Sequence, residues 1–72
     1  MGEGVKQVRR VIQHKQTGQF LTAAGGWTAD VEQAQQLPNV LSAVRLSREL
    51  ELRDVELVLK FQEGKYDVRL EL

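Results

Sequence analysis

Cysteine is absent from this chain of 72 residues, and proline occurs only once. The lack of cysteine excludes disulfides, thiolate metal sites and cysteine nucleophiles, and it is compatible with a reducing cytosol. No apolar run approaches the roughly 18 residues that a membrane span requires. The first ten residues, MGEGVKQVRR, lack the apolar region of a secretory signal. We therefore expect a cytoplasmic protein without a membrane partner.

Net charge is also absent, because ten basic residues balance ten acidic ones. A neutral chain has no overall field that attracts nucleic acid or an anionic membrane. The basic residues are nevertheless unevenly placed: Lys6, Arg9, Arg10 and Lys15 lie close together near the start, and no acidic residue separates them. Excess positive charge is thus confined to one strand-like segment.

The length of the chain and its 42% hydrophobic content indicate one small domain over residues 1–72. A chain of this size buries only about 60% of the surface that it exposes when unfolded. Small chains without disulfides or a metal often gain further burial by self-association. A homodimer is therefore expected before any motif is considered.

Four segments have the composition or the alternation of β-strands. Residues 5–14 and 19–24 are rich in β-branched, aromatic and other apolar side chains, and the turn between them places Gly18 where positive φ is needed. Residues 53–61 and 66–72 alternate apolar and polar side chains, and the short link QEGK joins them as a second hairpin. We expect the most apolar strand, the third, inside the sheet and the basic first strand at an edge.

Residues 28–50 carry the spacing of an amphipathic helix instead. Thr28 or Asp30 is placed to cap its start, and Asp30 would form a capping box with Gln33. The sequence therefore predicts that a helix begins directly after the single tryptophan.

Pro38 interrupts this helical pattern, because proline removes a hydrogen bond from a helix interior and crowds the preceding turn. The interruption predicts a first helix that ends near Leu37 and a second helix capped by Asn39, with a single kinked helix as the alternative. The order β-β-α-β-β predicts an α+β fold: a four-stranded, mainly antiparallel sheet with a Pro-broken helical region packed on one face. The other face is left to solvent or to a partner.

Several short motifs occur in a fixed order: TG-x-FL at 17–21, WT-x-D at 27–30, Ala34 and Leu37. In this respect the chain resembles a loose group of small uncharacterised bacterial and phage proteins. Those proteins have a TG-x-[YF]-L hairpin, a W-T-x-D helix start and a VEL-type strand, and they tend to have phenylalanine at the position of Leu37. The resemblance covers about residues 8–61; it supports the α+β fold and implies no activity.

Candidate catalytic residues are few. His14 is the only histidine, and the two serines lie in the helical region outside any nucleophile motif. One histidine with scattered carboxylates lacks the clustering that zinc requires. The pair Gly25 and Gly26 lacks the lysine-bearing loop of a phosphate site, and a bend from strand to helix explains it. We therefore expect no catalytic residue, no metal, no cofactor and no enzyme activity.

The first functional hypothesis is a protein-interaction or self-association module. If Phe20 and Ile12 face the helix, then Val11, Leu21 and Val58 point the other way and form an apolar strip on the uncovered face of the sheet. Such a strip would bind a protein partner or a second copy of the chain as a homodimer. Leu21→Glu would then disperse the dimer without unfolding the chain. The alternative is three scattered exposed side chains that bind nothing.

The second hypothesis is a weak nucleic-acid-binding module that uses the first hairpin. Lys6, Arg9, Arg10 and Lys15 would contact phosphates, and Trp27 would stack on a base. Two observations argue against it: the adjacent arginines point to opposite faces of a strand, and aromatic residues make up only 6% of the chain. Trp27 has an alternative role as a lid that closes one end of the core.

Overall fold

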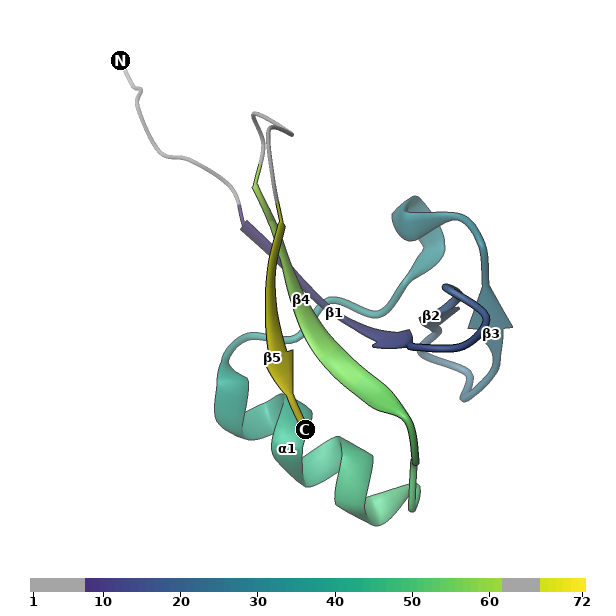
Figure 1. The fold of residues 1–72 in the computed structure, drawn as a ribbon, viewed down its shortest axis with the longest axis vertical. Helices are drawn as coiled ribbons and strands as arrows, with labels where there is room; N and C mark the ends of the chain where they lie inside the picture. The colour runs from purple at the N-terminus through teal and green to yellow at the C-terminus, as the bar shows by residue number, and fades with distance from the viewer. Residues whose placement is uncertain (1–7, 62–66) are drawn as a thin grey trace.

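The computed structural model describes residues 8–61 and 67–72, which form one α+β fold with a five-stranded antiparallel sheet (Figure 1). The strands lie side by side in the order β3-β2-β1-β4-β5. In chain order the elements are β1 (Val8–His14), β2 (Phe20–Leu21), β3 (Trp27–Thr28), the 3-10 helix η1 (Val31–Gln33), the α-helix α1 (Val40–Glu49), β4 (Val55–Phe61) and β5 (Asp67–Glu71).

Both expected hairpin pairings are present. β1 pairs with β2 through a turn in which Gly18 has a φ of 76°, and β4 pairs with β5 over five residue pairs from Glu56↔Glu71 to Lys60↔Asp67. The QEGK link of the second hairpin lies outside the described residues.

The strand order differs from the prediction at β1. β4 lies inside the sheet as expected, but β1 lies between β2 and β4 and is not at an edge. The physical reason is burial: the neighbouring residues Val11 and Ile12 point to opposite faces and are both buried, which is typical of an interior strand covered on both sides. The basic residues of β1 therefore lie on the faces of the sheet.

The helix predicted directly after the tryptophan is present only as the single-turn 3-10 helix η1. Trp27 and Thr28 form β3, which pairs with β2 and adds a strand that was not expected. Asp30 is a cap, since its side chain accepts a hydrogen bond from the Glu32 N–H at 2.9 Å, but η1 ends after a single turn. The following amides bond to the sheet instead of extending the helix: Gln35 N donates to Leu21 O at 2.9 Å.

The second helix begins where the sequence predicts. The Asn39 side chain accepts from Ser42 N at 2.8 Å, and the residues around Pro38 are not helical, so the alternative of one kinked helix is excluded. α1 ends in a Schellman motif, in which Leu52 N donates to Ser47 O at 2.9 Å and Glu51 adopts a φ of 53°. This turn leads the chain from α1 directly into β4.

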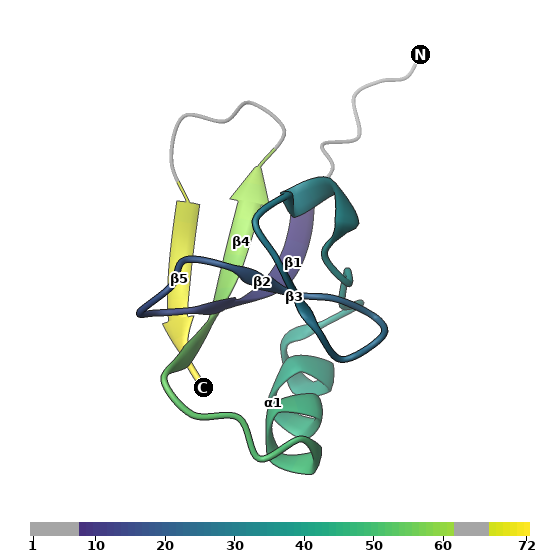
Figure 2. The same ribbon diagram turned by 90° about the vertical axis from the view of Figure 1, so that its right-hand side faces the viewer.

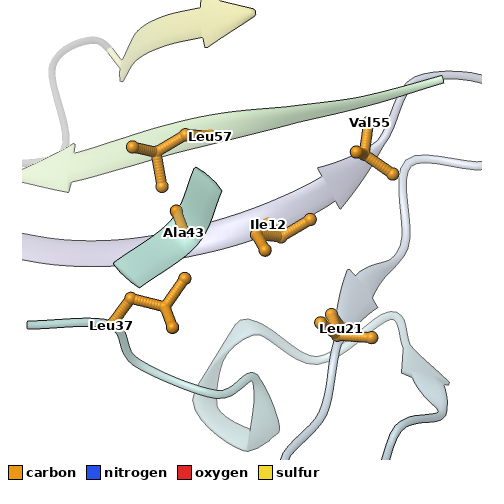
Figure 3. Close-up of a cluster of buried hydrophobic side chains, with 6 residues drawn as sticks. All are labelled: Ile12, Leu21, Leu37, Ala43, Val55 and Leu57. Carbon is orange, nitrogen blue, oxygen red and sulfur yellow. The ribbon is translucent and has the colours of Figure 1, made fainter. Parts of the chain in front are cut away.

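The sheet carries buried side chains on both faces. The helix-face core lies between the sheet and α1, and Figure 3 shows its six residues: Ile12, Leu21, Leu37, Ala43, Val55 and Leu57. The opposite-face core is smaller and consists of Val11, Phe20, Ala34 and Val58, with Val31 packed against it. The prediction of a face left to solvent or to a partner is therefore wrong for the part of the sheet around Val11, Phe20 and Val58.

Residues 34–37 connect the two faces. Ala34 belongs to the opposite-face core and Leu37 to the helix-face core, so the chain passes from one face to the other within four residues. It passes beside β2 and β1, because Gln35 N bonds to Leu21 O and Leu37 N bonds to Arg10 O, both at 2.9 Å. β2 is only two residues long, so it pairs with only part of the edge of β1. The remaining part of that edge is open to residues 34–37 as they cross from one face to the other.

Candidate functional site

The expected interface residues lie in the interior. Val11, Leu21 and Val58 are exposed by only 0%, 2% and 0%, so they do not form a surface strip, and that prediction is wrong. Two causes combine. The register Gln13↔Phe20 places Phe20 on the face of Val11 and Leu21 on the helix face, which inverts the expected assignment for β2. In addition, Val31 and Ala34 cover the face that was expected to be open.

The basic residues of the first hairpin are dispersed. Arg9 and Arg10 lie on opposite faces of β1, as the sequence predicts, and the Arg9 guanidinium donates to Glu32 at 2.9 Å. Lys15 lies beyond the end of β1, where its Nζ donates to both carboxylate oxygens of Glu71 at 2.6 and 2.7 Å. Lys6 lies outside the described residues.

Trp27 packs on the core. Its ring is half-buried against the helix-face core and meets the His14 ring edge-on, with 5.4 Å between the ring centroids and 86° between the planes. Trp27 is paired with Leu21 and so lies on the helix face, whereas Arg9 lies on the other face of the sheet. The packing agrees with the lid interpretation, and Trp27, Arg9 and Lys15 share no single surface that would hold a nucleic-acid strand.

The hydrogen bonds of the His14 and Ser47 side chains are local, and the His14 ring also meets Trp27. His14 Nδ1 accepts from Gln16 N at 3.2 Å, and the buried Ser47 hydroxyl donates to Val44 O at 2.8 Å. In residues 8–61 and 67–72, no three histidine, cysteine, aspartate or glutamate side chains lie close enough to hold a metal ion. Among the same residues, no helix has both the length and the apolar character to cross a membrane.

An open groove lies on the helix face, where the C-terminal part of α1 and its connection to β4 meet Leu72, the residue that follows β5. Its volume is about 790 Å³. α1 packs against β1 and β4. Figure 2 shows α1 on the β1 side of the sheet and β5 at the sheet edge away from α1. We call this space the α1–β5 groove; it is lined by Val44, Ser47, Arg48, Glu51, Leu52, Arg53, Asp54, Val55 and Leu72.

Exposed apolar side chains continue both walls of the α1–β5 groove. On α1, Val40 and Leu41 lie one turn before Val44 on the same side of the helix, and Leu41 is 63% exposed. On β5, Val68 and Leu70 share a face with the groove residue Leu72, and they are 37% and 38% exposed. The exposed apolar side chains of α1 and β5 thus lie on the helix face, whereas the predicted strip of Val11, Leu21 and Val58 lies in the interior.

The sequence contained part of the signal for this surface. The alternation of residues 66–72 already placed Val68, Leu70 and Leu72 together on one strand face. It did not reveal that α1 covers β1 and β4 and leaves the face of β5 half open. The sequence analysis did not identify Leu41 as part of an exposed apolar surface, because helical spacing alone does not say how much of the helix the sheet covers.

The opposite face of β5 carries charged side chains that bond across the sheet. Lys60 Nζ donates to Asp67 at 3.0 Å, and the Arg69 guanidinium donates to Glu56 and to Gln13. β5 is therefore amphipathic, with an apolar face toward the groove and an ionic face on the other side.

We expect the pKa of Lys15 to lie above the ordinary lysine value. The main cause is the hydrogen bond to Glu71; partial desolvation lowers the pKa, and the nearby charges of Glu71, Glu56 and Asp54 raise it. Because the pKa is raised on folding, the pair stabilises the fold fully below pH 10.5, the ordinary value, and the contribution is lost as pH rises through the folded pKa. An NMR titration of the Lys15 ammonium measures this shift.

The matched control for the Lys15 titration is Glu71→Gln, which keeps a hydrogen-bond acceptor and removes the charge. Its Lys15 should titrate at a lower pH than that of the wild type. Equal pKa values in the two proteins would contradict the Lys15 to Glu71 pairing.

No protein-family model, curated protein or solved structure matches this chain. Its function must therefore be argued from its own residues and their geometry.

Proposed function

We propose that the chain is a non-enzymatic protein-binding module that holds its partner in the α1–β5 groove. The observation that carries this proposal is the grouping of exposed apolar side chains from α1 and β5 around one open groove. Apolar surface that is gathered on one side of a small domain, with a polar rim, is typical of an interaction site. Here the polar groups are four of the lining residues, Arg48, Glu51, Arg53 and Asp54, which carry both signs of charge.

Affinity capture from the native cell, followed by reconstitution with the purified partner, tests the proposal. Leu41→Glu places a charge beside the groove, one turn from the lining residue Val44, and because Leu41 is 63% exposed the fold should persist. We expect this variant to bind the reconstituted partner about tenfold or more weakly than the wild type. The control is Gln33→Glu, which adds the same charge at an exposed position in η1, and it should bind as the wild type does.

Equal binding by Leu41→Glu and the wild type would contradict the groove as the binding site. Recovery of nucleic acid in place of protein, with binding that weakens steeply as salt rises, would instead favour the hypothesis based on the first hairpin.

A further inference from the structure

The outer edge of β5 is an open strand edge of useful length. β5 is the last strand of the sheet, and no other strand within residues 8–61 or 67–72 pairs with that edge. The sheet ends on its other side at β3, which has only two residues, whereas β5 has five. An unpaired strand edge presents N–H and C=O groups that another strand can pair with.

β5 has few of the features that normally protect an edge. It contains no proline, and its register with β4 runs without a bulge from Glu56↔Glu71 to Lys60↔Asp67. It does carry charged residues, which protect an edge when they repel an incoming strand. Whether they repel depends on the sequence of that incoming strand.

The charges of β5 are complementary to those of a second β5. When two copies pair antiparallel about a two-fold axis through Leu70, Arg69 of each copy lies opposite Glu71 of the other. Cross-strand pairs of opposite charge stabilise a sheet, and like charges destabilise it. An axis through Arg69 would instead set Arg69 against itself and Asp67 against Glu71. An axis through Val68 would also pair opposite charges, Asp67 with Arg69, but it pairs only residues 67–69 of the described strand, whereas an axis through Leu70 pairs residues 68–72. Charge and length of pairing together therefore favour the register with Leu70 on the axis.

The apolar side chains of β5 match in the same register. Leu70 lies opposite Leu70 and Val68 lies opposite Leu72, so the apolar face of one copy continues into that of the other. Val68 and Leu70 are 37% and 38% exposed in the single chain, which leaves apolar surface for this contact to bury. Arg69 and Glu71 also keep 47% and 76% of their side chains exposed beside their partners within the chain, so both charges are accessible to a second copy.

We infer that the partner at the β5 edge is a second copy of this chain, joined by antiparallel β5 to β5 pairing with Leu70 on the two-fold axis. The result is a closed dimer with one continuous ten-stranded sheet. The pairing involves only five residues of each chain, so the dimer is weak and reversible, not obligate. The inference rests on the proposed function, because it makes self-association one form of the protein binding. It uses the strand edge and the adjacent apolar side chains Val68 and Leu70, and it does not use the groove-lining residues of α1.

Two variants at Leu70 test the register directly. Leu70→Lys and Leu70→Glu each place like charges opposite one another across the axis, so each protein alone should be monomeric under conditions in which the wild type dimerises. An equimolar mixture of the two places lysine opposite glutamate, and it should form a heterodimer with an affinity at least about tenfold higher than either variant shows for itself. Sedimentation velocity over a concentration series measures all three cases, and circular dichroism shows that each variant is folded.

Gln33→Lys is the matched control, since it places the same charge at an exposed position of η1, away from the strand edge. It should dimerise as the wild type does. The inference is overturned if the wild type stays monomeric at high concentration, if Leu70→Lys dimerises as well as the wild type, or if the mixture forms no heterodimer. None of these results affects capture of another protein by the groove, which Leu41→Glu tests separately.

Discussion

Leu21→Glu is expected to unfold the protein. Leu21 is 2% exposed and packs with Ile12 and Leu37 in the helix-face core. Removing a buried leucine side chain costs about 2–5 kcal/mol, and burying a carboxylate adds several kcal/mol more. A chain of 72 residues has a total stability of about 4–11 kcal/mol. The substitution therefore removes most or all of the stability, which circular dichroism and urea unfolding will show.

The control for Leu21→Glu is Leu41→Glu, which makes the same change at an exposed position of α1. It should keep the far-ultraviolet spectrum and the unfolding midpoint close to those of the wild type. A folded Leu21→Glu protein would mean that Leu21 points away from α1, which is the assignment that the sequence alone suggested.

Phe20→Ala is expected to have the second largest effect. Phe20 is buried in the opposite-face core with Val11 and Val58, and the Lys60 ammonium lies 5.8 Å from the centre of its ring. Truncation of a buried phenylalanine costs about 3–5 kcal/mol because it removes apolar contact and leaves a cavity. In a domain of this size, that loss lowers the melting temperature by at least about 12 °C, which calorimetry measures.

Val31→Ala is the comparison for Phe20→Ala, because Val31 packs at the margin of the same core and is only half-buried. It should cost about 1 kcal/mol. If Phe20→Ala is no more destabilising than Val31→Ala, the opposite-face core does not contribute to stability as the structure indicates. Large effects at both Phe20 and Leu21 establish a sheet that is covered on both sides, since neighbouring strand residues point to opposite faces.

The candidate surface was predictable only in part. Alternation in β5 identified Val68 and Leu70 as residues of one apolar face, but the expected interface was placed in β1, β2 and β4, where all three residues are buried. Hydropathy says that a side chain is apolar, and it does not say whether another segment covers it. The cover over Val11 and Val58 comes from Val31 and Ala34, which the sequence assigned to a helix on the other face.

Local signals in the sequence by themselves determined the two hairpins, the cap of α1 by Asn39 and the amphipathic character of β5. Each of these depends on residues a few positions apart, such as an alternating strand or a cap beside a proline. Only the tertiary structure decided the pairing Gln13↔Phe20, the interior position of β1 and the path of residues 34–37 from one face to the other. A shift of one residue in a strand register exchanges its two faces, and the residues on each side of the turn contain no local signal that fixes this register. The burial of Val11, Leu21 and Val58, and the exposure of the helix face near β5, follow from that long-range packing.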